Sequence, residues 1–247
     1  MNKKIILFLL EGQSDLRALE YPLALFFNAI SKNIECICLT PQNGKSGDIT
    51  GESSVNQKEI LKIIPTWWNI SYNLSIKGLE ATDVLEIVHI VDSDGTYIPN
   101  ENIQFYMGEK AEYLSDGIKH KWPERIIDRN TRKKRNLTTL KNSSTISIGT
   151  TKVNYSIFYF SCNLDHYLSG NRNISVKDKF MFAEKFSIKI QTHEDLLNYL
   201  FSNDNPIKKH HTIKESWEWL GDLFNSLRFS TNLGLCLIKY LNDMVAT

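Results

Sequence analysis

Three largely apolar runs within residues 1–100 have the length of buried β-strands. They cover residues 5–10, 34–39 and 84–91. Short apolar runs of this kind are typical of strands that helices cover on both faces, as in a parallel sheet. Between the first two runs, apolar residues from Leu16 to Ile30 recur at nearly helical spacing. We expect Ser14 to cap this helix and Pro22 to kink or restart it.

The same alternation continues along the chain. Residues 57–68 have a helical pattern that Pro65 should stop or bend, and residues 155–160 form a fourth apolar run. Strands that alternate with helices favour right-handed parallel crossovers. We therefore predict an α/β fold with a mostly parallel sheet flanked by helices. From Leu164 onward helical patterns dominate, which predicts a helical C-terminal portion.

Residues 101–152 break this alternation. The segment is polar, and the stretch from residue 142 to residue 152 suggests a hairpin or loop. We interpret the segment as an insertion into one domain that spans residues 1–247. The domain would then consist of a core of residues 1–100, the insertion, and a closing part of residues 153–247 with the last strand and the C-terminal helices.

The overall composition restricts the function only slightly. With 42% apolar residues the chain can build a substantial core, and a net charge of +1 neither favours nor excludes a polyanionic partner. Four cysteines are too few for a disulfide scaffold, and we interpret them as reduced. The apolar run near the N-terminus is too short for a signal peptide or a membrane span. We therefore expect a cytoplasmic protein without a membrane partner.

The distribution of charge is more informative than its sum. Between Lys119 and Lys141 there are nine basic residues and two acidic ones, a local net charge of +7. A basic segment of this kind can bind a phosphate backbone, so we predict that it contacts nucleic acid. The predicted contacts are Lys121, Arg125, Arg129, Arg132, Lys133, Lys134 and Arg135. A solvated, mobile surface loop is the open alternative.

Acidic residues stand at the ends of two predicted strands. Glu11 follows the first run and precedes Gly12, while Asp92 and Asp94 follow the third run and precede Gly95. In open parallel sheets ligands bind beyond the carboxyl ends of the strands, so these side chains should meet at one edge. Several carboxylates in one crevice repel each other unless a cation lies between them. We predict Mg²⁺ (or Mn²⁺), which prefers oxygen ligands.

These residues resemble the TOPRIM family, which topoisomerases, bacterial primases and OLD-type nucleases share. The family pattern is a strand that ends in Glu-Gly with a further acid shortly after, then a strand that ends in Asp-x-Asp-Gly. In this chain "LLEGQSD" and "HIVDSDG" match it. The resemblance implies a Rossmann-like TOPRIM fold and Mg²⁺-dependent phosphodiester chemistry.

The resemblance also implies roles for single residues. Glu11 would be the catalytic acid or base and would share in metal binding with Asp92 and Asp94. Asp15 would add a further metal ligand, although a first-turn acid favoured by the helix dipole is an equal alternative. Gly12 and Gly95 would support the two turns.

The chain also departs from the family. Pro22, the insertion at residues 101–152, and the lack of an assignable nucleophilic tyrosine or helicase-like region argue against a topoisomerase or a replicative primase. A nuclease for DNA or RNA, similar to OLD-like or phage-defence TOPRIM effectors, is the function that the resemblance implies. A second protein such as an ATPase could supply its regulation. The alternatives are a non-catalytic nucleic-acid- or protein-binding partner with a degenerate acidic site and, less favoured, a receiver-like phosphoacceptor.

Two further segments carry candidate chemistry. Asp165 and His166 follow the fourth strand and could lie beside the metal ligands, with His166 orienting a water. The favoured alternative is a helix N-terminus with Asp165 in its first turn. Residues 43–47, "NGKSG", lack the glycine that a P-loop needs at position 39, so we expect no nucleotide site there, although Lys45 could lie above the crevice.

Overall fold

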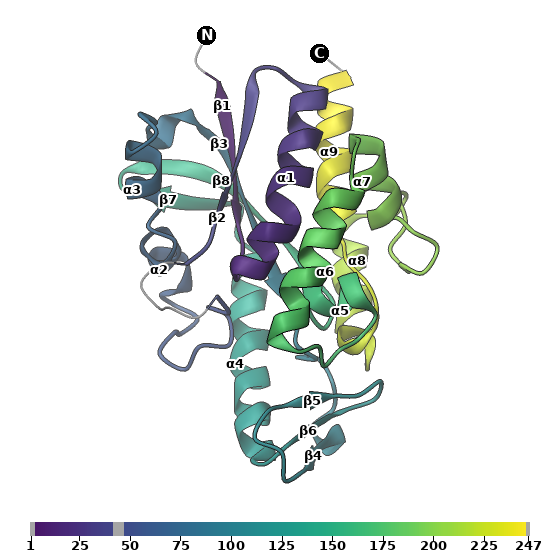
Figure 1. The fold of residues 1–247 in the computed structure, drawn as a ribbon. Coiled ribbons are helices and arrows are strands. Elements are labelled where there is room, and N and C mark those ends of the chain that lie inside the picture. The colour runs from purple at the N-terminus through teal and green to yellow at the C-terminus, as the bar shows by residue number, and fades with distance from the viewer. Residues whose placement is uncertain (1–2, 42–46, 246–247) are drawn as a thin grey trace.

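A five-stranded sheet lies at the centre of the molecule (Figure 1). The computed structural model describes residues 3–41 and 47–245. The strands of the sheet are β1 (Lys4–Leu9), β2 (Ile34–Leu39), β3 (Val84–Asp92), β7 (Thr145–Ile148) and β8 (Thr151–Phe160). Their order is β2–β1–β3–β8–β7, in which the first four are parallel and β7 is antiparallel to β8. The predicted α/β class with a mostly parallel sheet is therefore confirmed.

Helices cover both faces of this sheet (Figure 1). One face carries α1 (Gln13–Ile30), α5 (Leu164–Ser169), α6 (Val176–Lys189), α7 (His193–Leu200) and α9 (Leu233–Val245). The other carries α2 (Ile60–Trp67), α3 (Ile70–Ser75), α8 (Ile213–Gly221) and the C-terminal part of α4 (Pro123–Lys141). Successive residues of β1 serve the two layers, since Ile5 and Leu7 pack in one core while Ile6 and Phe8 pack in the other. Short 3₁₀ turns occupy Ala81–Asp83, Asn100–Asn102 and Asn225–Leu227.

Helix α1 differs from the expectation at its N-terminus and at Pro22. It is continuous from Gln13 to Ile30, so the helix does not restart at Pro22. Pro22 is buried on the same helix face as Leu19 and Phe26, and the packing of this apolar face outweighs the backbone hydrogen bond that a proline cannot make. The N-cap is Gly12 and not the predicted Ser14.

The other predicted elements are present with shifted ends. The helix expected over residues 57–68 is α2, which contains Pro65 and ends two residues beyond it. The fourth strand is β8, which begins four residues before the predicted residue 155 and forms a hairpin with β7, in the place where a hairpin or loop was expected. The helical C-terminal portion is confirmed by the helices from α5 to α9.

The segment of residues 101–152 contains regular structure beyond that hairpin. It forms a small sheet of β4 (Ile103–Phe105), β6 (Ile118–His120) and β5 (Glu112–Tyr113), which is followed by helix α4. Figure 1 shows the small sheet beside the N-terminal end of α4, below the main sheet. The alternative of a mobile loop for the basic segment is therefore wrong.

The sequence of α4 hides its helical pattern because polar residues occupy part of the buried face. Ile126, Asn130, Lys133, Leu137 and Leu140 follow each other at steps of four and three residues, and all five are buried. This is the spacing of one helix face. Since Asn130 and Lys133 are polar, the face does not show up as an apolar repeat.

None of the helices in the described ranges combines the length and the apolar composition that a membrane span requires. All four cysteines are free thiols, as predicted, and Cys162 and Cys236 are buried.

Candidate active site

Six acidic side chains gather at the carboxyl edge of the main sheet. They are Glu11, Asp15, Asp48, Asp92, Asp94 and Asp165, here called the acidic cluster. They follow β1, β2, β3 and β8, which are the four parallel strands. Parallel strands end at the same edge, and this brings together residues that are far apart in the chain.

Glu11 and Asp92 lie side by side in this cluster. Leu9 pairs with His89 across β1 and β3, so Glu11 comes level with the last residues of β3. The backbone amide of Asp92 donates a hydrogen bond to Glu11 Oε1 at 3.1 Å. The amide of Leu164 donates to Asp92 Oδ1 at 2.9 Å, which fixes this carboxylate against the start of α5.

The turn after β3 holds Asp94 in an unusual backbone conformation. Asp94 and Gly95 have φ angles of 49° and 67°, in the left-handed region. The amide of Asp94 donates to the carbonyl of Cys162 at 2.7 Å, and Arg129 Nη2 donates to the carbonyl of Asp94 at 2.8 Å. A Cβ on Gly95 would lie 2.6 Å from Leu227 Cδ2, so this turn requires glycine, in agreement with the supporting role expected for Gly95.

Gly12 does not have the conformational role that we expected. Its φ is −157°, an extended conformation that any residue adopts, and a Cβ there would contact nothing within 4 Å. Its contribution is its amide, which donates to Asp15 Oδ2 at 3.0 Å. The glycine that lies against Glu11 is Gly47, where a Cβ would overlap the carbonyl group of Glu11.

Lys133 is the resident cation of the acidic cluster. Its side chain is fully buried, and its Nζ lies 2.6 Å from Asp94 Oδ2 and 3.0 Å from Asp48 Oδ2. Burial lowers the pKa of Lys133, but Asp48, Asp94 and Glu11 more than offset this effect, so the pKa is raised and the amine stays charged. The prediction that Lys133 is a surface contact for nucleic acid is wrong, because its ammonium group is enclosed by carboxylates.

The remaining carboxyl groups, those of Glu11, Asp15 and Asp92, form no ion pair with a basic side chain among the described residues. Burial raises the pKa of Glu11 well above its usual value, and of its neighbours Lys133 lowers it while Asp48 raises it. Burial likewise raises the pKa of Asp92, with further contributions from Glu11 and Asp15. Burial and the nearby Asp165 raise the pKa of Asp15 to about 6. These shifts describe a site that gains stability from an added positive charge.

Asp165 and His166 occupy the first turn of α5, which was the favoured alternative for them. The Asn163 side chain caps this helix by accepting a hydrogen bond from the amide of His166 at 2.8 Å. Asp165 forms an ion pair with Lys179 of α6 and adds to the negative field at Asp15. Burial and the charge of Arg172 lower the pKa of His166 to about 4, and no carboxylate contributes to that shift. We find no contact of His166 with the acidic cluster among the described residues.

A preformed metal site is not present in the part of the chain that the structure describes. There, no group of three or more His, Cys, Asp or Glu side chains is arranged to hold an ion. Lys133 forms ion pairs with Asp48 and Asp94, and Lys179 forms one with Asp165. The donor chemistry nevertheless fits a hard divalent cation, which prefers oxygen ligands. The acids of the cluster that no lysine pairs with are Glu11, Asp15 and Asp92, and each offers carboxylate oxygens.

A cleft of about 970 Å³ opens onto the turn after β3. Asp92 and Asp94 line it together with the basic side chains of Lys110, Arg172 and Lys179. The loop that contains Tyr106, the strand β5 and the start of α6 form its other walls. The cleft gives solvent and ligands access to the carboxylates at the end of β3.

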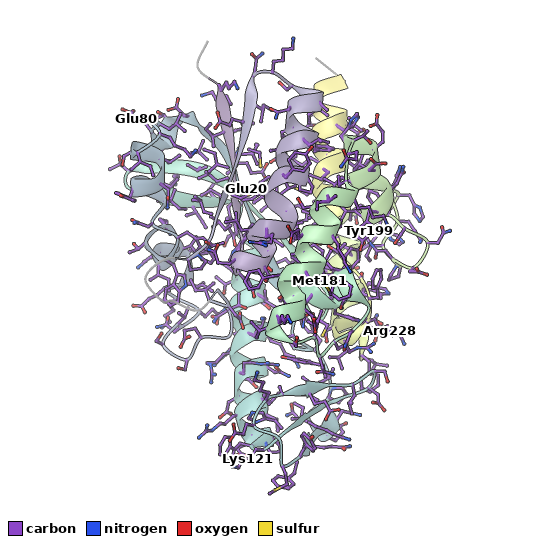
Figure 2. All side chains as sticks on the ribbon, viewed as in Figure 1. Glu20, Glu80, Lys121, Met181, Tyr199 and Arg228 are labelled. Atoms are coloured by element: carbon purple, nitrogen blue, oxygen red, sulfur yellow. The ribbon has the colours of Figure 1, made fainter. Side chains whose placement is uncertain are left out.

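The other basic residues predicted to contact nucleic acid have different surroundings. Lys121 and Arg125 lie over the ring of Trp122, with Nζ and Cζ at 4.9 Å and 4.2 Å from its centroid. In Figure 2 Lys121 lies at the lower end of the molecule, opposite to the end where β1 begins in Figure 1. Arg129 is directed inward, since Nη1 donates to the hydroxyl of Tyr113 at 3.0 Å.

The last three members of this set lie in the middle of α4. Lys134 Nζ lies 5.9 Å from the ring centroid of Tyr97. Arg132 and Arg135 line a second cavity, away from the cleft beside β3. All three side chains are at least partly exposed, unlike Lys133.

Sequence reasoning missed Asp48 and Lys179. Asp48 follows β2 as Glu11 follows β1, and its position beyond a parallel strand was a usable signal. The Oγ1 of Thr50 and the amide of Gly51 donate to Asp48 Oδ1 at 2.5 Å and 3.0 Å. Lys179 had no such signal, because it meets Asp165 only through the packing of α6 on α5. Lys45 and most of residues 43–47 lie outside the described residues.

The chain was compared with protein-family models, with curated proteins and with solved structures. No protein-family model, no curated protein and no solved structure matches it.

Proposed function

We propose that this protein is a metal-dependent nuclease of the TOPRIM type that hydrolyses phosphodiester bonds in DNA or RNA. The observation that carries the proposal is the contact of Glu11 with Asp92, in one cluster with Asp94, at the carboxyl edge of a parallel sheet. These residues also carry the sequence resemblance to the family. The role in phage defence and a regulatory partner such as an ATPase stay predictions.

The carboxylates of Glu11 and Asp92, with Asp15 nearby, would hold the Mg²⁺ or Mn²⁺ ion. When bound, a divalent cation stabilises the negative charge that develops on the phosphate oxygens. Because burial raises the pKa of Glu11, this group holds a proton more readily than an exposed glutamate, which suits a general acid or base. Lys133 would fix the orientation of Asp94, since it binds Asp94 Oδ2 at 2.6 Å.

The cleft beside β3 is the proposed place for the substrate strand. Its volume of about 970 Å³ is in the range of sites for small ligands, and it exposes Asp92 and Asp94 to that space. Arg172 and Lys110 offer positive charge for phosphate groups, and Tyr106, which is 44% exposed, offers a ring for a base.

Cleavage of labelled single- and double-stranded DNA and RNA, with Mg²⁺, Mn²⁺ or EDTA, tests the proposal. Glu11→Gln should abolish cleavage and leave the thermal unfolding transition in place, since the amide oxygen still accepts the bond from Asp92. The matched control is Glu20→Gln, an exposed glutamate of α1 that Figure 2 labels. Unchanged cleavage by the Glu11→Gln protein would rule out the assignment.

A non-catalytic partner is the second candidate. It is favoured by the ion pairs of Lys133 with Asp48 and Asp94 and of Lys179 with Asp165, because lysines stabilise a degenerate site in this way without a metal ion. Binding of nucleic acid by the wild-type protein without cleavage of any substrate, at any divalent ion tested, would support this candidate over the nuclease.

A further inference from the structure

A second cavity, of about 490 Å³, lies between helix α4 and the chain that leads into α2. Residues between Ser53 and Glu59 line one side of it, and Arg132, Arg135 and Asn136 line the other. It shares no lining residue with the cleft beside β3. The cavity is therefore separate from the proposed substrate cleft.

Positive charge predominates in this cavity. Three basic side chains, Lys58, Arg132 and Arg135, line it with one acidic side chain, Glu59. The carboxylate of Glu59 is held by Asn56, whose Nδ2 donates to Glu59 Oε2 at 2.7 Å. Neither arginine forms an ion pair with an acidic side chain among the described residues. An anion in the cavity would find two guanidinium groups, with Glu59 as the one carboxylate among the residues that line it.

The guanidinium of Arg132 has hydrogen-bonding capacity that the described residues do not use. Its Nη2 donates to the carbonyl of Gly51 at 3.4 Å, a long hydrogen bond. Its Nε is buried and has no hydrogen-bond partner in the described part of the chain. The guanidinium group has five N–H donors and is partly exposed, so it has donors left for an acceptor in the cavity that it lines. Phosphate oxygens match the fork of an arginine in charge and in geometry.

The two segments that line the cavity also supply Asp48 and Lys133. Arg132 precedes Lys133, the lysine that binds Asp48 and Asp94. Asn136 Nδ2 donates to the carbonyl of Thr50 at 2.8 Å and is buried, so it ties the segment after Asp48 to α4. The cavity is therefore connected along the chain to one acid of the acidic cluster and to its lysine.

We infer that this cavity binds a phosphate group of the nucleic-acid strand at a position away from the bond that is cleaved. The inference rests on the proposed function and adds a second point of attachment for the same substrate. A free phosphate ion or a mononucleotide has the same chemistry, so the experiment must separate these ligands from a strand.

The test is the binding of a fluorescent single-stranded oligonucleotide, measured by anisotropy in EDTA so that no cleavage occurs. The double variant Arg132→Gln/Arg135→Gln should weaken binding about tenfold or more, and should reduce the slope of log K against log salt by about 1 to 2. Lys58→Gln, a change at an exposed position, should weaken binding less but in the same direction. The matched control is Lys185→Gln/Lys189→Gln, which removes the same charge from exposed positions of α6.

Titration calorimetry with inorganic phosphate and with a mononucleotide provides the second arm. The inference is supported if the arginine variant loses strand binding while the α6 control keeps it and the thermal unfolding of both variants stays cooperative. It is overturned if the arginine variant and Lys58→Gln bind the strand like the wild type. It is also overturned if the arginine variant loses only the free phosphate. Because the assay needs no metal and no cleavage, failure of the nuclease proposal leaves these results unchanged.

Discussion

Lys133→Met removes the charge that joins Asp48 to Asp94 and keeps most of the side-chain volume. In the wild type Nζ lies 3.0 Å and 2.6 Å from the two carboxylates. Loss of one member of a buried ion pair costs about 3–5 kcal/mol, because the partner is left without compensation. The side chains of Asp48 and Asp94 are 22% and 18% exposed, so water screens part of this loss. We expect a decrease of about 3 kcal/mol in the free energy of unfolding at neutral pH.

This cost should depend on pH. Burial raises the pKa of Asp48, but Lys133 and the bond from Thr50 more than offset this effect and hold the pKa below its usual value. A lowered folded-state pKa contributes stability that is present above the unfolded pKa, about 3.9, and is lost as the pH falls through the folded value. Since the variant lacks this contribution, the difference between the two proteins should shrink below about pH 4.

Urea unfolding followed by circular dichroism, at neutral pH and at about pH 3, below the range in which the contribution is lost, measures both quantities. For a chain of this size about 3 kcal/mol also corresponds to a decrease of roughly 6–12 °C in Tm. The control is Lys134→Met, the next residue, whose side chain is partly exposed and should change stability by no more than about 1 kcal/mol. A Lys133→Met cost below about 1 kcal/mol, or one equal at the two pH values, would refute the electrostatic account.

Two further predictions concern buried titratable groups whose pH dependences have opposite signs. Because the pKa of Asp15 is raised to about 6, its ionised form costs up to about 3 kcal/mol at neutral pH. Asp15→Asn should therefore raise the unfolding free energy in EDTA at neutral pH, and the gain should disappear below about pH 4; an unchanged urea midpoint would contradict this. Burial lowers the pKa of His89 to about 3, so the wild type loses stability as the pH falls below about 6.5. The double variant His89→Leu/Tyr155→Phe removes both partners of the 2.9 Å hydrogen bond. It should reduce the loss of unfolding free energy by about 1.4 kcal/mol per pH unit. Wild type and variant with parallel curves of unfolding free energy against pH would contradict this.

The parallel sheet could be predicted because its strands are marked by local patterns. Buried runs such as residues 84–91 are apolar on both faces, and the alternation with helices sets the chain direction. The same reasoning brought Glu11 and Asp92 to one edge, where the structure places them in contact. The carboxyl end of a buried strand follows from the sequence, while its start is less well marked, since β8 begins four residues before the predicted residue 155.

The partners of these acids could not be predicted, because they depend on tertiary packing. A lysine is usually found at the protein surface. Lys133 is buried between Asp48 and Asp94 only because α4 packs against the segment after β2. The polar residues Asn130 and Lys133 on the buried face also concealed the helix itself. Pro22 lies inside α1 because the apolar packing of the helix outweighs the local backbone preference against an internal proline.

The proposed nuclease requires that Glu11 and Asp92 together bind a divalent cation. Titration of the purified protein with Mn²⁺, with free Mn²⁺ measured by electron paramagnetic resonance, tests this requirement. We expect saturable binding to the wild type and to the Glu20→Gln control, and binding at least about tenfold weaker for Glu11→Gln and for Asp92→Asn. Wild-type protein that binds no Mn²⁺, or variants that bind it as tightly as the wild type, would contradict the claim.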